Sequence, residues 1–243
     1  ARMAIPRGIG AAGLLALLPL AITPWGYPGG YLVLAGIYLM AMPLLHWLPA
    51  APTDALTTAR APNKAAARQV LFGIGILSVG QGGLWAFAER IGVGIGIASE
   101  TIGTILGGAA LVGLLGAGIS AALGTRLGRA GALGVGLLGI GAATLGLAHA
   151  GTPTAFTAAA VVWMGAFLFT LPYVMGTAAA LDAGGRWVAV ATGMSTIGTA
   201  LGPILAGLLA TRFGYPALGW FATACTGCAI AAIVPVGRRL DRY

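Results

Sequence analysis

The sequence predicts an all-α integral membrane protein with eight transmembrane helices. Of its 243 residues, 58% are hydrophobic and only 7% are charged, whereas a soluble domain carries about 25% charged residues. The apolar residues gather in eight spans, and a helix needs about 20 mainly apolar residues to cross a bilayer. Glycine is abundant, with 42 residues, which lets membrane helices pack closely.

The charged residues lie in the connections between these spans. Lys and Arg number 13 against five acids, giving a net charge of +8. In a soluble protein this excess would suggest nucleic-acid binding, but the cations are scattered over short connections and form no basic module. Cys225 and Cys228 lie in an apolar run without a nearby histidine or second cysteine pair. We therefore expect no metal, redox centre or cofactor.

The first two spans predict a helical hairpin followed by a linker. They cover residues 8–23 and 31–48, with a turn rich in Pro and Gly between them. Residues 1–50 thus form a first unit of two transmembrane helices. The polar stretch 51–69 is the longest between spans, and we interpret it as a cytoplasmic central loop.

The remaining six spans predict a six-helix bundle over residues 70–237. The spans cover residues 70–90, 95–123, 132–148, 154–181, 187–211 and 217–236. Short connections separate most of these spans. Residues 238–243 form a polar cytoplasmic tail.

The distribution of cations predicts the orientation. If the N-terminus lies in the cytoplasm, only Arg90 and Arg212 fall outside, and the other eleven cations fall on the cytoplasmic side. This is the bias that the positive-inside rule describes, and a miscounted span would remove it. We expect a multi-pass protein of the bacterial inner membrane, with both ends of this chain in the cytoplasm.

A polar face in the span 70–90 is the best candidate for function. Ser78, Gln81, Trp85 and Glu89 recur at steps of three, four and four, so they stack on one side of a helix. Lipid offers an amide no hydrogen bond, so this face must contact protein or water. We expect it to line a solute pathway, where Trp85 stacks on the solute and Glu89 takes up a proton. The alternative is that Gln81 bonds a neighbouring helix and Glu89 only marks the membrane edge.

The span 154–181 carries a second candidate surface. Trp163, Phe167 and Thr170 share one face, and Pro172 removes a backbone hydrogen bond just beyond them. Freed carbonyls inside a membrane are tolerated where they line a cavity. Packing against neighbouring helices is the alternative for this aromatic stripe.

Four other polar residues have local interpretations. Glu100 lies near the start of a helix, where a negative charge is favourable. Thr192, Ser195 and Thr199 are expected to bond carbonyl groups of their own helix rather than a ligand.

Three features together resemble the major facilitator superfamily (MFS) of secondary transporters. Residues 120–131, SAALGTRLGRAG, are similar to its cytoplasmic loop signature, in which Arg126, Gly128 and Arg129 match. Ala121, Thr125 and Ala130 depart from the signature. Residues 200–221 resemble the penultimate helix and its exit into the last. The long basic loop followed by six spans resembles the central loop and the C-terminal half.

The resemblance implies a partial MFS fold, namely the last two helices of the N-terminal half and the complete C-terminal half. The missing N-terminal helices of the same permease are then an expected partner. It also implies alternating access of a small solute, with protons as a candidate coupling ion. In the family the first helix of each three-helix repeat lines the cavity, which here means the third and sixth spans. Arg126, Gly128 and Arg129 are then expected in a cytoplasmic gate loop.

No motif in the sequence supports an enzyme. Gly134, Gly136 and Gly139 spell GxGxxG, but they lie inside an apolar span without a preceding strand. Ser195 lacks a GxSxG elbow and a plausible base. No cation lies in mid-membrane, so a neutral, aromatic or cationic solute is favoured. The rival interpretation is an eight-helix structural or interaction module that transports nothing.

Overall fold

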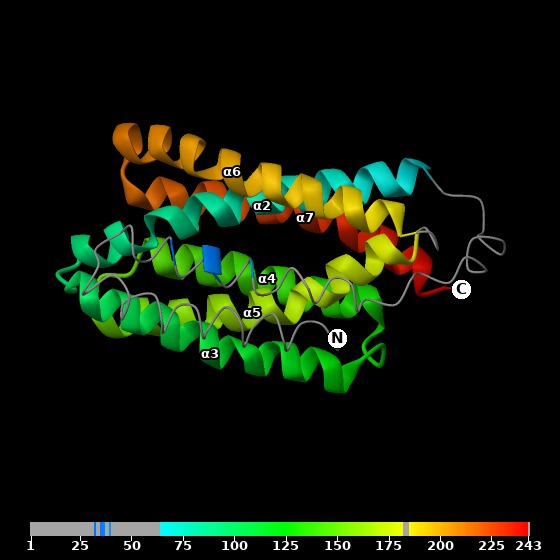
Figure 1. The fold of residues 1–243 in the computed structure, drawn as a ribbon, viewed down its shortest axis with the longest axis horizontal. Helices are drawn as coiled ribbons and strands as arrows, with labels where there is room; N and C mark the ends of the chain where they lie inside the picture. The colour runs from blue at the N-terminus through cyan, green and yellow to red at the C-terminus, as the bar shows by residue number, and fades with distance from the viewer. Residues whose placement is uncertain (1–31, 33–34, 37–38, 40–63, 182–184, 243) are drawn as a thin grey trace.

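The computed structural model describes residues 64–181 and 185–242, together with Leu32, Ala35, Gly36 and Leu39. Among these residues it contains six helices that are long and apolar enough to cross a membrane. They are α2 (Lys64–Gly94), α3 (Ser99–Leu123), α4 (Gly128–Ala148), α5 (Pro153–Ala179), α6 (Arg186–Phe213) and α7 (Tyr215–Leu240) (Figure 1).

The all-helical prediction is confirmed, but the described residues contain six helices able to cross a membrane, so the predicted count of eight is not supported by them. The two spans expected at 8–23 and 31–48 lie outside the described residues, apart from the four single positions in the second span. Most of the predicted central loop, 51–69, lies outside them as well. Its last six residues form the first turns of α2, which begins at Lys64. Polar residues can extend a helix beyond its apolar span, as they do at the start of α2.

Local sequence explains how several helices begin. The Thr152 hydroxyl accepts a hydrogen bond from the Ala155 N–H at 3.2 Å, and Pro153 takes the first helical position of α5. Gly96 adopts a φ of +84° in the turn before α3. Glu100 lies in the first turn of α3, where its charge suits the helix dipole as expected.

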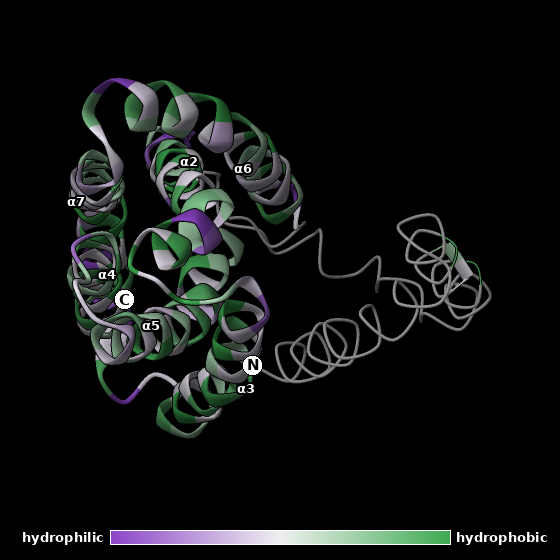
Figure 2. Cartoon of the chain, turned by 90° about the vertical axis from the view of Figure 1, so that its left-hand side faces the viewer, coloured by the Kyte–Doolittle hydropathy of each residue, from purple (hydrophilic) through white to green (hydrophobic). Residues whose placement is uncertain are grey.

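The six helices form an arc when the bundle is viewed along its length. Figure 2 shows the order α6, α2, α7, α4, α5 and α3 around the arc. The main contacts follow this order, since α6 packs chiefly on α2, and α3 chiefly on α5. The helices α2–α4 and α5–α7 pack in corresponding ways, and α2 and α5 run in opposite directions. This is the pattern of two inverted three-helix units.

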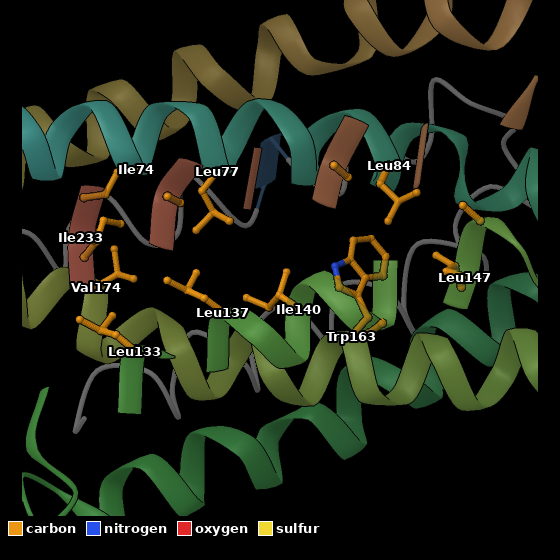
Figure 3. Packing of buried hydrophobic residues seen from close by; sticks show 14 of the residues in the cluster. Ile74, Leu77, Leu84, Leu133, Leu137, Ile140, Leu147, Trp163, Val174 and Ile233 are labelled. Carbon is orange, nitrogen blue, oxygen red and sulfur yellow. The ribbon is translucent and has the colours of Figure 1, made fainter. Parts of the chain in front are cut away.

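The apolar core lies where α2, α4, α5 and α7 meet. Figure 3 shows Leu77 of α2 above Leu137 and Ile140 of α4, with Ile74 and Leu84 of α2 to either side, near Ile233 and Trp163 respectively. All of these side chains are buried. In the described bundle α2 is the most buried helix and α6 the least, and α5 is no more buried than α3 at the end of the arc.

Glycines allow α2 and α6 to approach each other at backbone distance. A Cβ on Gly82 would lie 2.8 Å from the Thr199 carbonyl oxygen. That carbonyl lacks its usual helical donor, because Pro203 occupies the position four residues later. A Cβ on Gly202 of α6 would likewise meet the Val79 carbonyl of α2. The proline therefore frees a carbonyl that packs against a glycine of the neighbouring helix.

Gly82→Ala should destabilise the bundle by about 1–3 kcal/mol, because the added methyl group meets backbone atoms that cannot rotate away. The measurement is thermal unfolding of the purified protein in detergent. Gly193→Ala on α6 is the matched control, since a Cβ there meets nothing within 4 Å. Equal losses in the two variants would contradict the proposed backbone contact.

Candidate solute site

Gln81 lies inside the bundle and connects three helices. Its side chain is 6% exposed. The Trp163 indole N–H donates to Gln81 Oε1 at 2.6 Å, and Gln81 Nε2 donates to the Thr226 hydroxyl at 3.3 Å. Thr226 in turn donates to the Ala222 carbonyl at 2.8 Å. The amide thus links α2, α5 and α7 through a chain of hydrogen bonds within the apolar core.

Trp85 lies next to this network but remains open to the surroundings. Its side chain is 44% exposed, whereas Trp163 is 2% exposed. The two ring centroids are 5.7 Å apart, with the planes tilted by 47°. Such tilted aromatic pairs are favourable beyond the area that they bury. Trp163 is therefore an anchored ring against which Trp85 rests.

Glu89 lies one helical turn beyond Trp85 and is exposed. Its sequence neighbour Arg90 places its guanidinium 5.1 Å from the centre of the Phe87 ring. Among the described residues, Glu89 forms no ion pair within 4 Å. Glu89 and Arg90 line a shallow depression of about 380 Å³, together with Tyr215, at the end of the bundle where α2 ends.

The polar face predicted on α2 therefore has two environments. Ser78 is half-buried, and its hydroxyl is 2.9 Å from that of Ser195 on α6. Gln81 is buried and hydrogen-bonded, which is the neighbouring-helix contact that the sequence left as the alternative. Trp85 and Glu89 are the members of this face that remain exposed.

The second predicted surface, on α5, is largely covered. Trp163 and Thr170 are each 2% exposed and Phe167 is half-buried, and Phe167 and Thr170 line a small cavity of about 30 Å³. Ser78 and Ser195 line the same cavity from α2 and α6. This volume is enough for a water molecule and too small for a solute. The structure brings these predicted residues together around a constriction.

The surface of α6 has two unlike exposed faces. One carries large apolar side chains, among them Ile197, Leu201 and Leu208. The other carries exposed threonines, namely Thr192, Thr196 and Thr199. Thr192 and Thr199 are three and four residues from Ser195, which contacts the α5 cavity, so this threonine face turns toward α5.

The hydroxyl groups of α6 differ in their hydrogen bonds. Thr192 donates to the Val188 carbonyl at 3.0 Å, and Thr196 donates to the Thr192 carbonyl at 3.0 Å. The prediction that Thr192 bonds its own helix is confirmed. The same prediction for Ser195 is wrong, because its hydroxyl instead meets Ser78 across the close α2–α6 contact.

The opposite end of the bundle is basic, and Asp241, the last acid of the chain, forms a contact with the start of α4 there. Eight of the ten described Lys and Arg residues lie at this end. The Asp241 carboxylate accepts hydrogen bonds from the backbone N–H groups of Arg129 and Ala130, at 2.8 and 2.9 Å. It thereby caps the start of α4 from the far end of the chain. Arg126, from the predicted gate loop, is exposed.

Gly128 is required by this cap for two reasons. Its φ is +66°, a conformation that L side chains rarely adopt. A Cβ there would also lie 3.0 Å from an oxygen of the Asp241 carboxylate. Sequence reasoning missed Asp241, although a single acid in the tail GRRLDRY is a visible signal.

Comparison with known proteins identifies the fold. No protein-family model and no curated protein matches the sequence. Among solved structures, the chain is similar to the crystal structure of a Major Facilitator Superfamily (MFS) transporter, FucP, in the outward conformation. The match has a TM-score of 0.66, covers 90% of this chain, and has 17% sequence identity. The chain has an MFS-like fold.

The MFS-like fold confirms the resemblance inferred from residues 120–131 and 200–221. The chain covers 55% of the FucP chain, so it spans about half the length of that structure. In MFS terms, α2–α4 and α5–α7 are two inverted three-helix repeats, and α2 and α5 are the first helix of each. The Gln81–Trp163 hydrogen bond therefore joins the two repeats at their leading helices.

Gln81→Leu should destabilise the protein by about 1–3 kcal/mol, because the buried Trp163 N–H loses its acceptor. Thermal unfolding in detergent measures the loss. Thr211→Val is the control, since the Thr211 hydroxyl bonds only carbonyls of its own helix at an exposed position. An unfolding temperature of Gln81→Leu equal to that of the control would show that the amide is not structural.

Asp241→Ala should cost about 0.5–2 kcal/mol, the usual range for loss of an N-terminal cap. Hydrogen exchange of the Arg129 and Ala130 amides should accelerate in this variant. Asp241→Asn keeps one acceptor oxygen, so the exchange rates of these amides in this variant should lie between those of Asp241→Ala and of the native protein. Unchanged exchange of both amides in Asp241→Ala would rule out the cap.

Proposed function

We propose that the chain is part of a secondary active transporter that moves a small solute across the membrane by alternating access. The MFS-like fold supports a transporter rather than an enzyme. One observation on this chain carries the proposal, namely the threonine face of α6 beside a large apolar face on the same helix. The Thr192 and Thr196 hydroxyls already bond their own helix, but their grouping with Thr199 on one face, apart from the large apolar side chains, fits a helix that lies between lipid and an aqueous pathway.

The pathway in this proposal runs along the open side of the arc, between α3 and α6. Trp85 and Glu89 of α2 and the threonine face of α6 border it, and Phe167 and Thr170 lie at its constriction. The hydrogen bond between Gln81 and Trp163 lies behind the exposed Trp85 ring and holds α2 against α5 at this place. The 30 Å³ cavity then represents the closed part of the pathway.

A second helical bundle is required to cover this open side. The FucP chain is about twice as long as the part matched here. We propose that the other half consists of two spans within residues 1–50 and four further helices outside this chain. The chain itself then holds eight helices, namely those two spans and the six described ones. The basic end of the bundle then faces the cytoplasm, since Lys and Arg are retained there. A bacterial inner membrane fits this orientation.

The rival function is a membrane module that holds other proteins and transports nothing. It would explain the interhelical hydrogen bonds of Gln81 and the glycine contacts of α2 and α6 equally well. It explains an exposed tryptophan and glutamate near the end of α2 only as markers of the membrane edge, and it gives no reason for threonines gathered on one face of α6. For these reasons we favour the transporter.

Thr196→Cys and Ile197→Cys test the aqueous pathway directly. The two residues are adjacent on α6 and have the same depth, but they lie on the threonine face and the apolar face respectively. In a background where Cys225 and Cys228 are replaced, a water-soluble thiol reagent should modify the Thr196→Cys variant at least about 10-fold faster than the Ile197→Cys variant. We expect this ratio because the thiolate is the reactive form of cysteine, and a thiol ionises in water but not in lipid.

Equal and slow modification of both variants would contradict the pathway and favour the rival module. A lipid-soluble maleimide should label both variants in every case, which controls for folding and for the accessibility of the introduced thiol.

We propose that the proton is the coupling ion and that Glu89 carries it. Glu89 is an exposed carboxylate in the next-to-last turn of α2, one helical turn from Trp85, whereas Glu100 lies in the first turn of α3. Glu89→Gln in the full-length protein should abolish the pH change that accompanies solute movement. Glu100→Gln is the matched control and should leave the pH change intact; the reverse pattern would remove Glu89 from the mechanism.

A further inference from the structure

The exposed half of the α2 polar face combines an aromatic ring with a negative charge. Trp85 and Glu89 are four residues apart, so their side chains are neighbours on the helix surface. Both are exposed, while most of α2 is buried against other helices. A surface that offers an indole ring and a carboxylate within one turn has the chemistry to bind a cation with an apolar body.

The ring is held in a fixed position by the residues behind it. Trp163 lies against it at a centroid distance of 5.7 Å and is itself fixed by the 2.6 Å hydrogen bond to Gln81. Gln81 is fixed in turn by Thr226. An aromatic surface that is already ordered loses little conformational entropy when a ligand stacks on it.

The charged group on the same face of α2 as the Trp85 ring is the Glu89 carboxylate. Arg90 is the cation closest in sequence and lines the same depression as Glu89, but it lies five residues from Trp85, on a different face of the helix, with its guanidinium over the Phe87 ring. Glu89 has no ion pair among the described residues, so its charge remains available. The second cation at this end, Arg212, lies in the last turn of α6.

From these contacts we propose that Trp85 and Glu89 bind an organic cation, with the apolar body of the ligand on the indole and its positive charge beside the carboxylate. This assignment rests on the proposed transport function, because an aqueous pathway is what would bring such a cation to this face. It goes further by naming the chemical class of the solute. The Arg90–Phe87 contact in the same region is an internal example of the same interaction.

Equilibrium binding of tetraphenylphosphonium to the purified 243-residue chain in nanodiscs tests the class of ligand. Two probes of similar size serve as comparisons, the anion tetraphenylborate and the neutral triphenylphosphine oxide. The cation should bind saturably and at least about 10-fold more tightly than the neutral probe. Saturable binding of the anion with equal affinity would overturn the proposal.

Three variants test the location of the site. Trp85→Ala should lower the affinity for the cation by about 10-fold or more, and Trp85→Phe should lower it less, since a phenyl ring binds cations more weakly than an indole. Glu89→Gln should lower the affinity for the cation by about 10-fold and leave the affinity for the neutral probe within about 2-fold. Trp220→Phe is the matched control, because Trp220 is a 62% exposed tryptophan on α7.

The outcomes separate this inference from the proposed function. If the cation binds equally well to native protein, Trp85→Phe, Glu89→Gln and Trp220→Phe, the site is wrong, whatever happens at Thr196. If the Thr196→Cys variant reacts with the aqueous reagent but no saturable binding of the cation is found, the transporter stands and the organic-cation assignment fails. If the cation binds as expected but the Thr196→Cys variant is inert, the site stands and the transport function fails.

Discussion

The hydrocarbon core of the membrane offers no hydrogen-bond partner, and this constraint organises the whole structure. Within the described residues, every fully buried side-chain nitrogen and oxygen has a hydrogen-bond partner. Gln81 meets the constraint through Trp163 and Thr226, and Ser78 meets it through Ser195. Each of these bonds connects different helices. Some of the covered polar groups therefore join the bundle together, whereas others, such as the hydroxyls of Thr170 and Thr177, bond only their own helix.

The same constraint explains why the helices approach so closely. Water does not drive these helices together inside a bilayer, so association depends on packing and on interhelical polar contacts. Gly82 and Gly202 remove the side chains that would separate α2 from α6. Pro203 frees the Thr199 carbonyl at the place where Gly82 admits it. Pro203 of α6 and Gly82 of α2 thus act together in a single backbone contact between the two helices.

Much of the fold could be predicted from the sequence, because apolar length and the placement of cations report directly on transmembrane helices. All six predicted spans after residue 69 correspond to helices. Polar residues such as Lys64 and Arg186 lengthen some helices beyond the prediction, whereas α3 begins four residues later than predicted and α5 ends two residues earlier. The candidate site was harder to predict. Helical spacing placed Ser78, Gln81, Trp85 and Glu89 on one face, but it could not show that the neighbouring helices cover the first two and leave the last two exposed. The Asp241 cap depends on a contact between residues more than 100 positions apart, which no local pattern reveals.

The central claim is that Trp85, on the exposed face of α2, contacts water, whereas the buried Trp163 ring behind it does not. Fluorine NMR of protein labelled with 5-fluorotryptophan, in bilayers, tests this without removing any aromatic contact. We predict a solvent isotope shift between H₂O and D₂O for the Trp85 resonance and none for Trp163, with Trp85→Phe and Trp163→Phe giving the assignments. A Trp85 resonance without a shift between H₂O and D₂O, but broadened by oxygen dissolved in the lipid, would show that this ring faces lipid and would contradict the account.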